Sequence, residues 1–330
     1  MRPHLMPHLL IPYASCSAAA WLPTLQALPP HSLKHLGQLL RGMKRVDNDT
    51  QNPESLSPPH ERALARALGL ATPETPDGLT PWAAHDAARH PQAGADQAWA
   101  WITPCHWAMG HLHATLSDPA ALALNEEDSR ALLAIMQPYF ETDGITLHYL
   151  APERWLAEGE LLRDLPTASL DRVLARNVDA WLPGARQAAP LRRLQNEMQM
   201  LLYTHPFNDA RELQRRLPVN SFWISGTGDL PSAQLGEALT PREAEQVSAP
   251  RSLAQAVFKE DWPGYAQAWT ALDAGDIAAL LARQRAGEHV CLTLCGENSA
   301  QTFETHRAGP WQSFSSLFSP LRILDVLKQL

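Results

Sequence analysis

The sequence contains few of the features that would assign it to a disulfide-rich or zinc-binding class. Its four cysteines are Cys16, Cys105, Cys291 and Cys295, and no CxxC pair occurs among the 330 residues. Cys291 and Cys295 belong to a predicted strand, where their Cα atoms would lie roughly 13 Å apart, too far for a disulfide. The sequence therefore predicts free thiols in a reducing compartment and offers no scaffold for a cysteine-based zinc site.

Long apolar runs and an excess of positive charge are also missing. No stretch approaches the roughly 18 apolar residues that span a membrane. The apolar segment near the N-terminus resembles a signal peptide, but Pro3, Pro7 and Pro12 interrupt it. The net charge of −8 argues against a surface that binds polyanions. We therefore expect a cytoplasmic protein that binds neither nucleic acid nor a membrane.

The composition is that of a globular protein with a substantial core. Hydrophobic residues make up 45% of the chain and charged residues 19%. Helical patterns alternate with short apolar strands, which favours an α/β fold in which a layered sheet carries helices on both faces. We expect one domain over residues 1–330. The proline-rich stretches 47–59 and 72–81 are interpreted as surface loops, because the segments between them are too short to fold alone.

Periodicity and capping residues place the main elements. A helix is predicted to begin after Asn125, whose side chain can cap it. Another should end before Pro206, with Asn208 capping a short continuation. The remaining predictions are strands at 9–13, 145–150, 219–225 and 290–295, and helices at 167–182, 191–202, 265–272 and 276–286.

Histidines are the first candidates for chemistry. His106, His111 and His113 lie close together in the sequence, and the last two could share one face of a strand. No carboxylate follows at a matching spacing, and zinc or iron sites usually need three protein ligands. Lining of a pocket is therefore favoured over metal binding. His31 and His35 lack the glutamate of an HExxH motif and are interpreted as part of a solvated helix face.

A glycine pair supplies the second candidate. Gly226-Thr227-Gly228 follows the predicted strand 219–225 and matches neither phosphate-loop pattern, so a tight turn is its default interpretation. Loops at the ends of sheet strands are, however, where α/β proteins bind ligands. The helix break at Pro206 brings further polar groups into the same part of the sequence. The predicted ligand-binding residues are His106, His111, Glu197, His205, Asn208, Arg211, Asn220, Ser221, Trp223, Gly226, Thr227 and Gly228.

These residue types suit a small anionic or phosphorylated ligand. Arg211 would pair with the anionic group, and the backbone amides of the glycine turn would surround it. No nucleophile elbow, Cys-His signature or kinase motif occurs, so no catalytic residue is assigned.

Several of the same segments occur together in a known family. They are Thr103-Pro104-Cys105-His106-Trp107, Glu197-Met198-Gln199-Met200, His205-Pro206 with Asn208 and Arg211, and Val219-Asn220-Ser221-Phe222-Trp223 with Gly226 and Gly228. Their order and combination over roughly residues 95–330 resemble the RpfE-type family of bacterial regulatory proteins. Members of that family are often described as predicted cofactor-independent phosphoglycerate mutases.

The resemblance implies the α/β scaffold of the alkaline-phosphatase superfamily. Those enzymes hold two metal ions with Asp and His at strand ends and use a Ser or Thr nucleophile. Here the first strand, ending at Tyr13, has no Asp at its end, and the last strand runs into Gly296 and Glu297 where an Asp-His pair is expected. The resemblance therefore implies the scaffold better than the activity, and no metal ligand or cofactor is predicted.

Three functions follow from these observations. The first is a regulatory or ligand-binding protein on a degenerate phosphomutase-like scaffold. The second is an active cofactor-independent phosphoglycerate mutase or phosphatase, which would need a divalent metal. The third is a protein-interaction module with an exposed patch around Trp99, Trp101 and Trp107 that binds another protein. Whether the chain is an enzyme stays open on the sequence.

Overall fold

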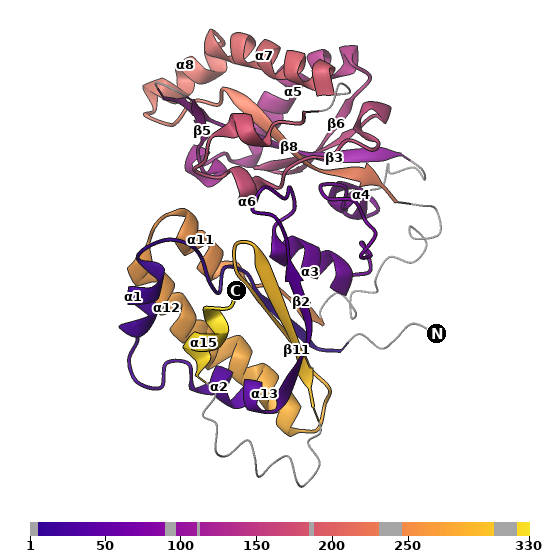
Figure 1. Cartoon of the computed structure of the whole chain (residues 1–330). Coiled ribbons are helices and arrows are strands. Elements are labelled where there is room, and N and C mark those ends of the chain that lie inside the picture. The colour runs from indigo at the N-terminus through magenta and orange to yellow at the C-terminus, as the bar shows by residue number, and fades with distance from the viewer. Residues whose placement is uncertain (1–5, 90–96, 111–112, 185–187, 231–245, 307–321) are drawn as a thin grey trace. The chain divides into compact units, whose positions relative to one another are not determined.

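The chain forms two compact units of mixed α/β structure (Figure 1). A computed structural model describes residues 6–89, 97–110, 113–184, 188–230, 246–306 and 322–330. Unit 1 consists of Met1–Glu54, Pro58–Gly69 and Leu239–Leu330, and unit 2 of Ser55–Ser57 and Leu70–Ala238. The α/β class predicted from the alternation of elements is confirmed. Unit 1 combines both ends of the sequence, so no single linker marks the division, and one domain over 1–330 stays a prediction.

Unit 1 is built on a five-stranded sheet in the order β2-β11-β10-β1-β9. Strand β1 is parallel to β9 and β10, whereas β11 is antiparallel to β10 and β2. Its strands are β1 (His8–Ile11), β2 (Met43–Thr50), β9 (Val247–Ser248), β10 (Cys291–Cys295) and β11 (Ser299–Thr305). Residues 47–50, predicted as loop, belong to β2, because their backbone pairs with β11. The predicted last strand, β10, is followed by one more.

Helices cover both faces of this sheet, as predicted. Leu9 and Leu292 point to the face that packs on most of the helices, whereas Leu10 and Cys295 contact Ala63 of helix α3 on the other face. This is the period-two alternation of strand side chains. The helices of unit 1 are α1 (Trp21–Gln26), α2 (Lys34–Arg41), α3 (Pro59–Ala67), α11 (Ser252–Phe258), α12 (Trp262–Leu272), α13 (Ala278–Arg285) and α15 (Ile323–Leu327).

The face covered by α3 changes from apolar to polar along the strands. At its polar end His8 Nε2 lies 2.8 Å from Thr293 Oγ1, which in turn lies 2.9 Å from Thr302 Oγ1. Three adjacent strands thus carry one line of hydrogen-bonded polar side chains. Burial lowers the pKa of His8 from 6.5 to about 4, so its imidazole is neutral at pH 7.

Unit 2 is built on a four-stranded antiparallel sheet in the order β6-β7-β3-β8, with a separate β4-β5 hairpin. Helices α5 and α7 pack on one face, and α4 packs against β3 and β8 (Figure 1). The strands are β3 (Ala98–Cys105), β4 (Trp107–Met109), β5 (Ala114–Leu116), β6 (Thr146–Ala151), β7 (Arg154–Glu158) and β8 (Ser221–Asp229). The helices are α4 (Trp82–Ala87), α5 (Glu126–Thr142), α6 (Leu170–Val173), α7 (Ala189–Tyr203) and α8 (Pro206–Leu213), with 3-10 turns at Pro119–Leu122, Glu160–Leu162 and Val178–Trp181.

The local predictions in unit 2 have mixed outcomes. Asn125 caps α5 by accepting the Asp128 N–H at 2.7 Å, as predicted. The helix predicted over 167–182 is wrong: α6 ends after one turn, and Ala175 adopts a φ of +57°. Helix α7 ends before Pro206 as predicted, but His205 caps α8, and Asn208 lies inside that helix.

The predicted turn at residues 226–228 is also wrong, because β8 continues through it to Asp229. The register between β8 and β3 shifts between Trp99 and Trp101, which is typical of a β-bulge. Gly226 has a φ of +63°, and a Cβ there would lie 2.9 Å from a ring carbon of Trp101. Trp101 stacks on Trp82 with ring centroids 6.3 Å apart. The glycine is therefore needed for strand geometry and for aromatic packing.

We expect Gly226→Ala to lower the free energy of unfolding by about 2–4 kcal/mol, because it adds backbone strain and overpacking together. Gly144→Ala is the matched control: its φ is +70°, and nothing lies within 4 Å of an added Cβ. That variant should cost only about 1 kcal/mol, the cost of the left-handed backbone alone. Urea denaturation measures both. Equal losses would contradict the packing role of Gly226.

We also expect a pH dependence of stability that His8→Gln removes. The pKa of His8 is lower in the folded protein than its ordinary value, so the unfolded chain binds more protons between pH 6.5 and about 4. Stability should therefore fall by about 2–3 kcal/mol as the pH falls through that window. Denaturant midpoints at pH 7 and pH 4.5 for both proteins measure the difference. The nearby Asp47, Asp49 and Glu304 are present in both, so parallel curves would contradict the assignment to His8.

Candidate functional site

A groove of about 630 Å³ in unit 1 is lined by α1, α2, α15 and the segment between α1 and α2. We call it the basic groove. Its apolar lining includes Leu25, Leu28, Leu33, Ile323 and Leu324, and its charged lining is Lys34, Arg41, Arg322, Asp325 and Lys328. Leu25 is buried and the other four apolar residues are half-buried. The groove therefore offers an apolar surface beside charged side chains.

Positive charge dominates the groove. Lys34 and Arg41 are seven residues apart on α2, which places them on one side of the helix two turns apart. Arg322 and Lys328 flank α15. All four side chains are exposed, and within the described part of the chain none forms an ion pair. Among the described lining residues, Asp325 is the one carboxylate. In a chain of net charge −8, this is a local excess of cations.

Helix α2 is held by a side chain from another element. Its N-cap position, Leu33, offers no side-chain hydrogen bond. The Asp273 carboxylate takes that role: it accepts the Leu36 N–H at 2.8 Å and the His35 N–H at 3.1 Å. Asp273 begins a π-helical turn, Asp273–Ile277, between α12 and α13. His35 also contacts this carboxylate, at 3.0 Å. The interpretation of His35 as a solvated residue was therefore wrong, because it packs into this cap.

Close packing also fixes α15 against α2. A Cβ at Gly37 would lie 3.1 Å from Cδ1 of Ile323, so the glycine allows the two helices to approach. The spacing of Lys34 and Arg41 was visible in the sequence as a cationic pair on one helix face. Arg322 and Lys328 lie almost 300 residues further along the chain. No sequence signal joins the two pairs.

The residues predicted from the sequence to bind a ligand all belong to unit 2, where most contact the backbone. Asn208 donates to the carbonyls of Leu202 at 2.8 Å and Val219 at 2.7 Å, and accepts the Val219 N–H at 2.9 Å. Arg211 donates to the carbonyls of Leu217 and Leu122 and lies 3.8 Å from the Asp128 carboxylate. Both side chains are buried and join loops to helices.

Three more members of the set bind backbone in the same way. Asn220 accepts the Trp107 N–H at 2.7 Å and donates to the Trp107 carbonyl at 3.0 Å. His106 Nδ1 lies 2.9 Å from the Pro218 carbonyl. His205 Nδ1 accepts the Phe207 N–H at 3.1 Å. Each of these contacts fixes the chain path at one end of β8 or α8.

The rest of the set is divided between the core and the surface. Trp223 is buried and donates to the Ala168 carbonyl at 3.0 Å, and the Thr227 hydroxyl lies 2.9 Å from that of Thr167. Ser221 is fully buried, and its Oγ has no hydrogen-bond partner among the described residues. Glu197 is half-buried on α7, and its carboxylate lies 3.5 Å from Arg193. His111 lies outside the described residues. Binding of an anionic ligand by this set stays a prediction.

The tryptophan patch is not exposed as the interaction hypothesis required. Trp99 and Trp107 are buried. Trp101 is half-buried, and Arg154 lies over its ring at 4.3 Å from the centroid. The residues therefore belong to the core and its edge, although binding of another protein elsewhere stays a prediction.

The carboxyl ends of β1 and β10 lack the expected Asp-His pattern. β1 leads into Pro12 and Tyr13, and the Tyr265 hydroxyl donates to the Tyr13 carbonyl at 2.9 Å. Glu297, which follows β10, accepts the Ser17 N–H at 2.7 Å. The ring of His60 on α3 lies 5.7 Å from that of Tyr13. Glu297 is thus used to hold the loop after β1.

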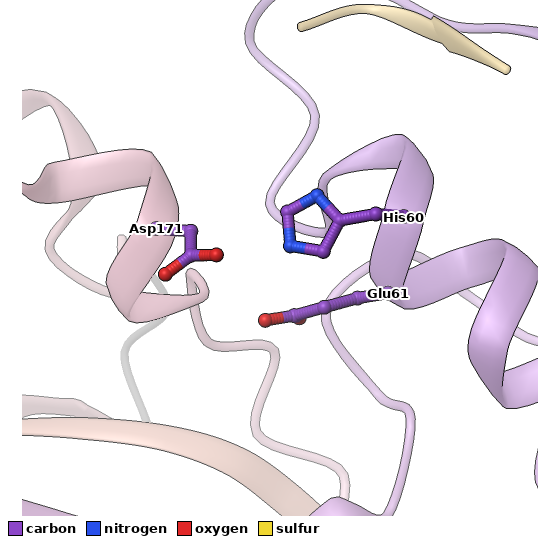
Figure 2. Close-up of side chains that lie close together, drawn as sticks. All are labelled: His60, Glu61 and Asp171. Carbon is purple, nitrogen blue, oxygen red and sulfur yellow. The ribbon is translucent and has the colours of Figure 1, made fainter. Parts of the chain in front are cut away.

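No sequence motif marks the polar residues at the start of α3. Figure 2 shows His60 and Glu61 at consecutive positions of that helix, and Asp171 on α6. His60 and Glu61 belong to unit 1, whereas Asp171 belongs to unit 2. Within unit 2 the Asp171 N–H donates to Ser169 Oγ at 3.2 Å.

The prediction of free cysteines is confirmed, since all four thiols are free and buried, whereas a reducing compartment stays a prediction. Burial raises the pKa of Cys16 to about 11 and that of Cys291 to about 12, so both are protonated at pH 7. Among the described helices, none is long and apolar enough to cross a bilayer.

Comparisons with known proteins give only distant structural similarity. No family model matches the chain, and no curated protein matches it. A cofactor-independent phosphoglycerate mutase from Thermoplasma acidophilum DSM 1728 is 14% identical, with a TM-score of 0.36 over 98% of this chain and 99% of that one. The PH0037 protein from Pyrococcus horikoshii is 12% identical, with a TM-score of 0.38 over 91% and 87%. At these low values neither similarity assigns an activity, and the RpfE-type resemblance stays a prediction.

We expect Arg211→Gln to destabilise the protein by about 3 kcal/mol, because it removes a buried guanidinium that binds two carbonyls and faces a carboxylate. Arg283→Gln is the control, since Arg283 forms an ion pair with Glu288 in which both side chains are exposed, and the change should cost at most about 0.5 kcal/mol. Chemical denaturation gives both values. Unchanged stability of the Arg211 variant would favour a ligand-binding role for this residue.

Proposed function

We propose that this protein binds a small anionic molecule with an apolar portion in the basic groove, and that this binding serves a regulatory role. The observation that carries the proposal is the cluster Lys34, Arg41, Arg322 and Lys328 around an apolar lining. These cations have no carboxylate partner among the described residues, so a bound anion would supply one.

The chemistry of the groove suits both halves of such a ligand. Lysine and arginine bind carboxylate or phosphate through charge-assisted hydrogen bonds, and arginine can do so with two parallel bonds. The neighbouring leucine and isoleucine side chains would cover an alkyl portion, at about 0.8 kcal/mol for each buried methylene. A volume of about 630 Å³ is in the ordinary range for a small-molecule site.

The positions of the cations favour one ligand held between two helices. Two of the four are on α2 and two flank α15. Helix α2 is fixed by Asp273, and α15 packs on Gly37, so little ordering would be required on binding. A rigid groove of this kind supports recognition of a specific shape.

The lining supports binding more than catalysis. An activated nucleophile needs a base within hydrogen-bond reach. Ser32 and His31 line the groove, but the hydrogen bonds of the described residues include none between their side chains. The proposed ligand is thus anionic, as expected from the sequence, but its proposed site lies in a different part of the chain.

We expect decanoate and decyl phosphate to bind the purified protein, and decyltrimethylammonium not to bind, in isothermal titration calorimetry. The double variant Arg41→Gln/Arg322→Gln should weaken decanoate binding roughly tenfold or more, since each partly exposed ion contact contributes up to about 1 kcal/mol. Affinity should fall as salt is raised.

Arg45→Gln provides the matched control, because Arg45 is exposed on β2 in the same unit and does not line the groove. It should leave decanoate binding unchanged. Equal binding of the anionic and cationic amphiphiles, or equal affinity in the double variant, would contradict the proposal.

A further inference from the structure

A second cavity lies on the polar part of the sheet face that α3 covers. We call it the sheet pocket. It has a volume of about 370 Å³, and its polar lining consists of His8, Asp47, Arg66, Cys291, Thr293, Thr302 and Glu304, beside small and apolar residues. It shares no lining residue with the basic groove.

The strands hold the polar groups of the sheet pocket in fixed positions. His8, Thr293 and Thr302 come from β1, β10 and β11 and form one hydrogen-bonded line across the sheet. His8 Nε2 takes part in that line, whereas no hydrogen bond of the described residues uses Nδ1. A neutral imidazole carries one donor and one acceptor nitrogen, so a ring nitrogen of His8 remains for a ligand.

Two carboxylates line the sheet pocket, and Glu304 is the one that forms no ion pair within the described residues. It pairs in register with Cys291 and is half-buried. The nearest lining cation, Arg66, is bound to Asp49 at 2.8 Å and lies 3.7 Å from Asp47. Lys44 is opposite Glu304 in register but forms no ion pair with it. Within the described part of the chain, the carboxylate of Glu304 therefore has no positive partner.

Small side chains keep the space above these groups open. Ala63 and Ala67 are one helical turn apart on α3, and both line the sheet pocket. Larger residues at these positions would bring the helix surface into the cavity. Instead, helix and sheet leave room for a compact molecule beside the Glu304 carboxylate, which no described cation neutralises.

We propose that the sheet pocket binds a small organic cation, an alkylamine or short diamine. Its ammonium group would pair with Glu304, and its other polar end would form hydrogen bonds with His8 and the threonine hydroxyls. The site is independent of the basic groove and takes a ligand of opposite charge. A metal ion fits less well, because no three His, Cys, Asp or Glu ligand atoms of the described lining lie within 4.8 Å of one another.

The test is titration of the whole protein with 1,4-diaminobutane, using 1,4-butanediol as the uncharged control of equal length. We expect the diamine to bind and the diol not to bind. Glu304→Gln should weaken diamine binding tenfold or more. Glu260→Gln, which removes an exposed carboxylate of the same unit outside the pocket, should leave it unchanged.

A variant that fills the cavity distinguishes binding in the sheet pocket from a general attraction of cations to an acidic protein. Ala67→Leu keeps every charge and occupies the cavity, so it should abolish diamine binding. Circular dichroism and unchanged decanoate binding show that each variant is folded and that the basic groove is intact. Equal diamine affinity in Glu304→Gln or in Ala67→Leu would overturn the proposal, whatever the outcome for decanoate.

Discussion

The parallel pairing of β1 with β10 is the constraint on which both proposed sites of unit 1 depend. Its register sets Leu9 beside Leu292 and His8 beside Cys291. The first pair belongs to the apolar face that holds the helix layer, and that layer includes α1 and α2 of the basic groove. The second pair lies on the opposite face and lines the sheet pocket. A slip of one residue would exchange the two faces, so the burial of the leucines also determines where the polar groups lie.

The two sites differ in how they are built. The basic groove is formed by helix surfaces, and its cations are exposed, so its attraction for anions depends on salt and on the approach of two helices. The sheet pocket is formed by strands, where polar groups are held by the ladder and by their own hydrogen bonds. Burial keeps His8 neutral, since the pKa is lowered to about 4, so Glu304 acts beside an uncharged imidazole at pH 7.

Unit 2 uses its polar residues differently. Asn208 and Arg211 bind backbone groups of the loop that leads into β8, and Asn220 binds the backbone of Trp107 in β4. Unpaired backbone groups would be costly to bury at these positions. Replacing such a side chain would leave buried backbone groups without hydrogen-bond partners. This explains why a set chosen for its chemistry, with an amide and a guanidinium beside a helix break, contains residues that hold the fold.

The sequence by itself determined the local features: the α/β alternation, the Asn125 cap, the end of α7 before Pro206, and free cysteines. These depend on side-chain periodicity and on groups a few residues apart. Only the tertiary structure decided that β8 continues through Gly226, because a glycine for a turn and a glycine for a bulge against Trp101 look the same in sequence. The tertiary structure also decided where the two proposed sites of unit 1 lie. Lys34 and Arg322, or His8 and Glu304, are almost 300 residues apart, and strand pairing and helix packing bring them together without leaving any local pattern.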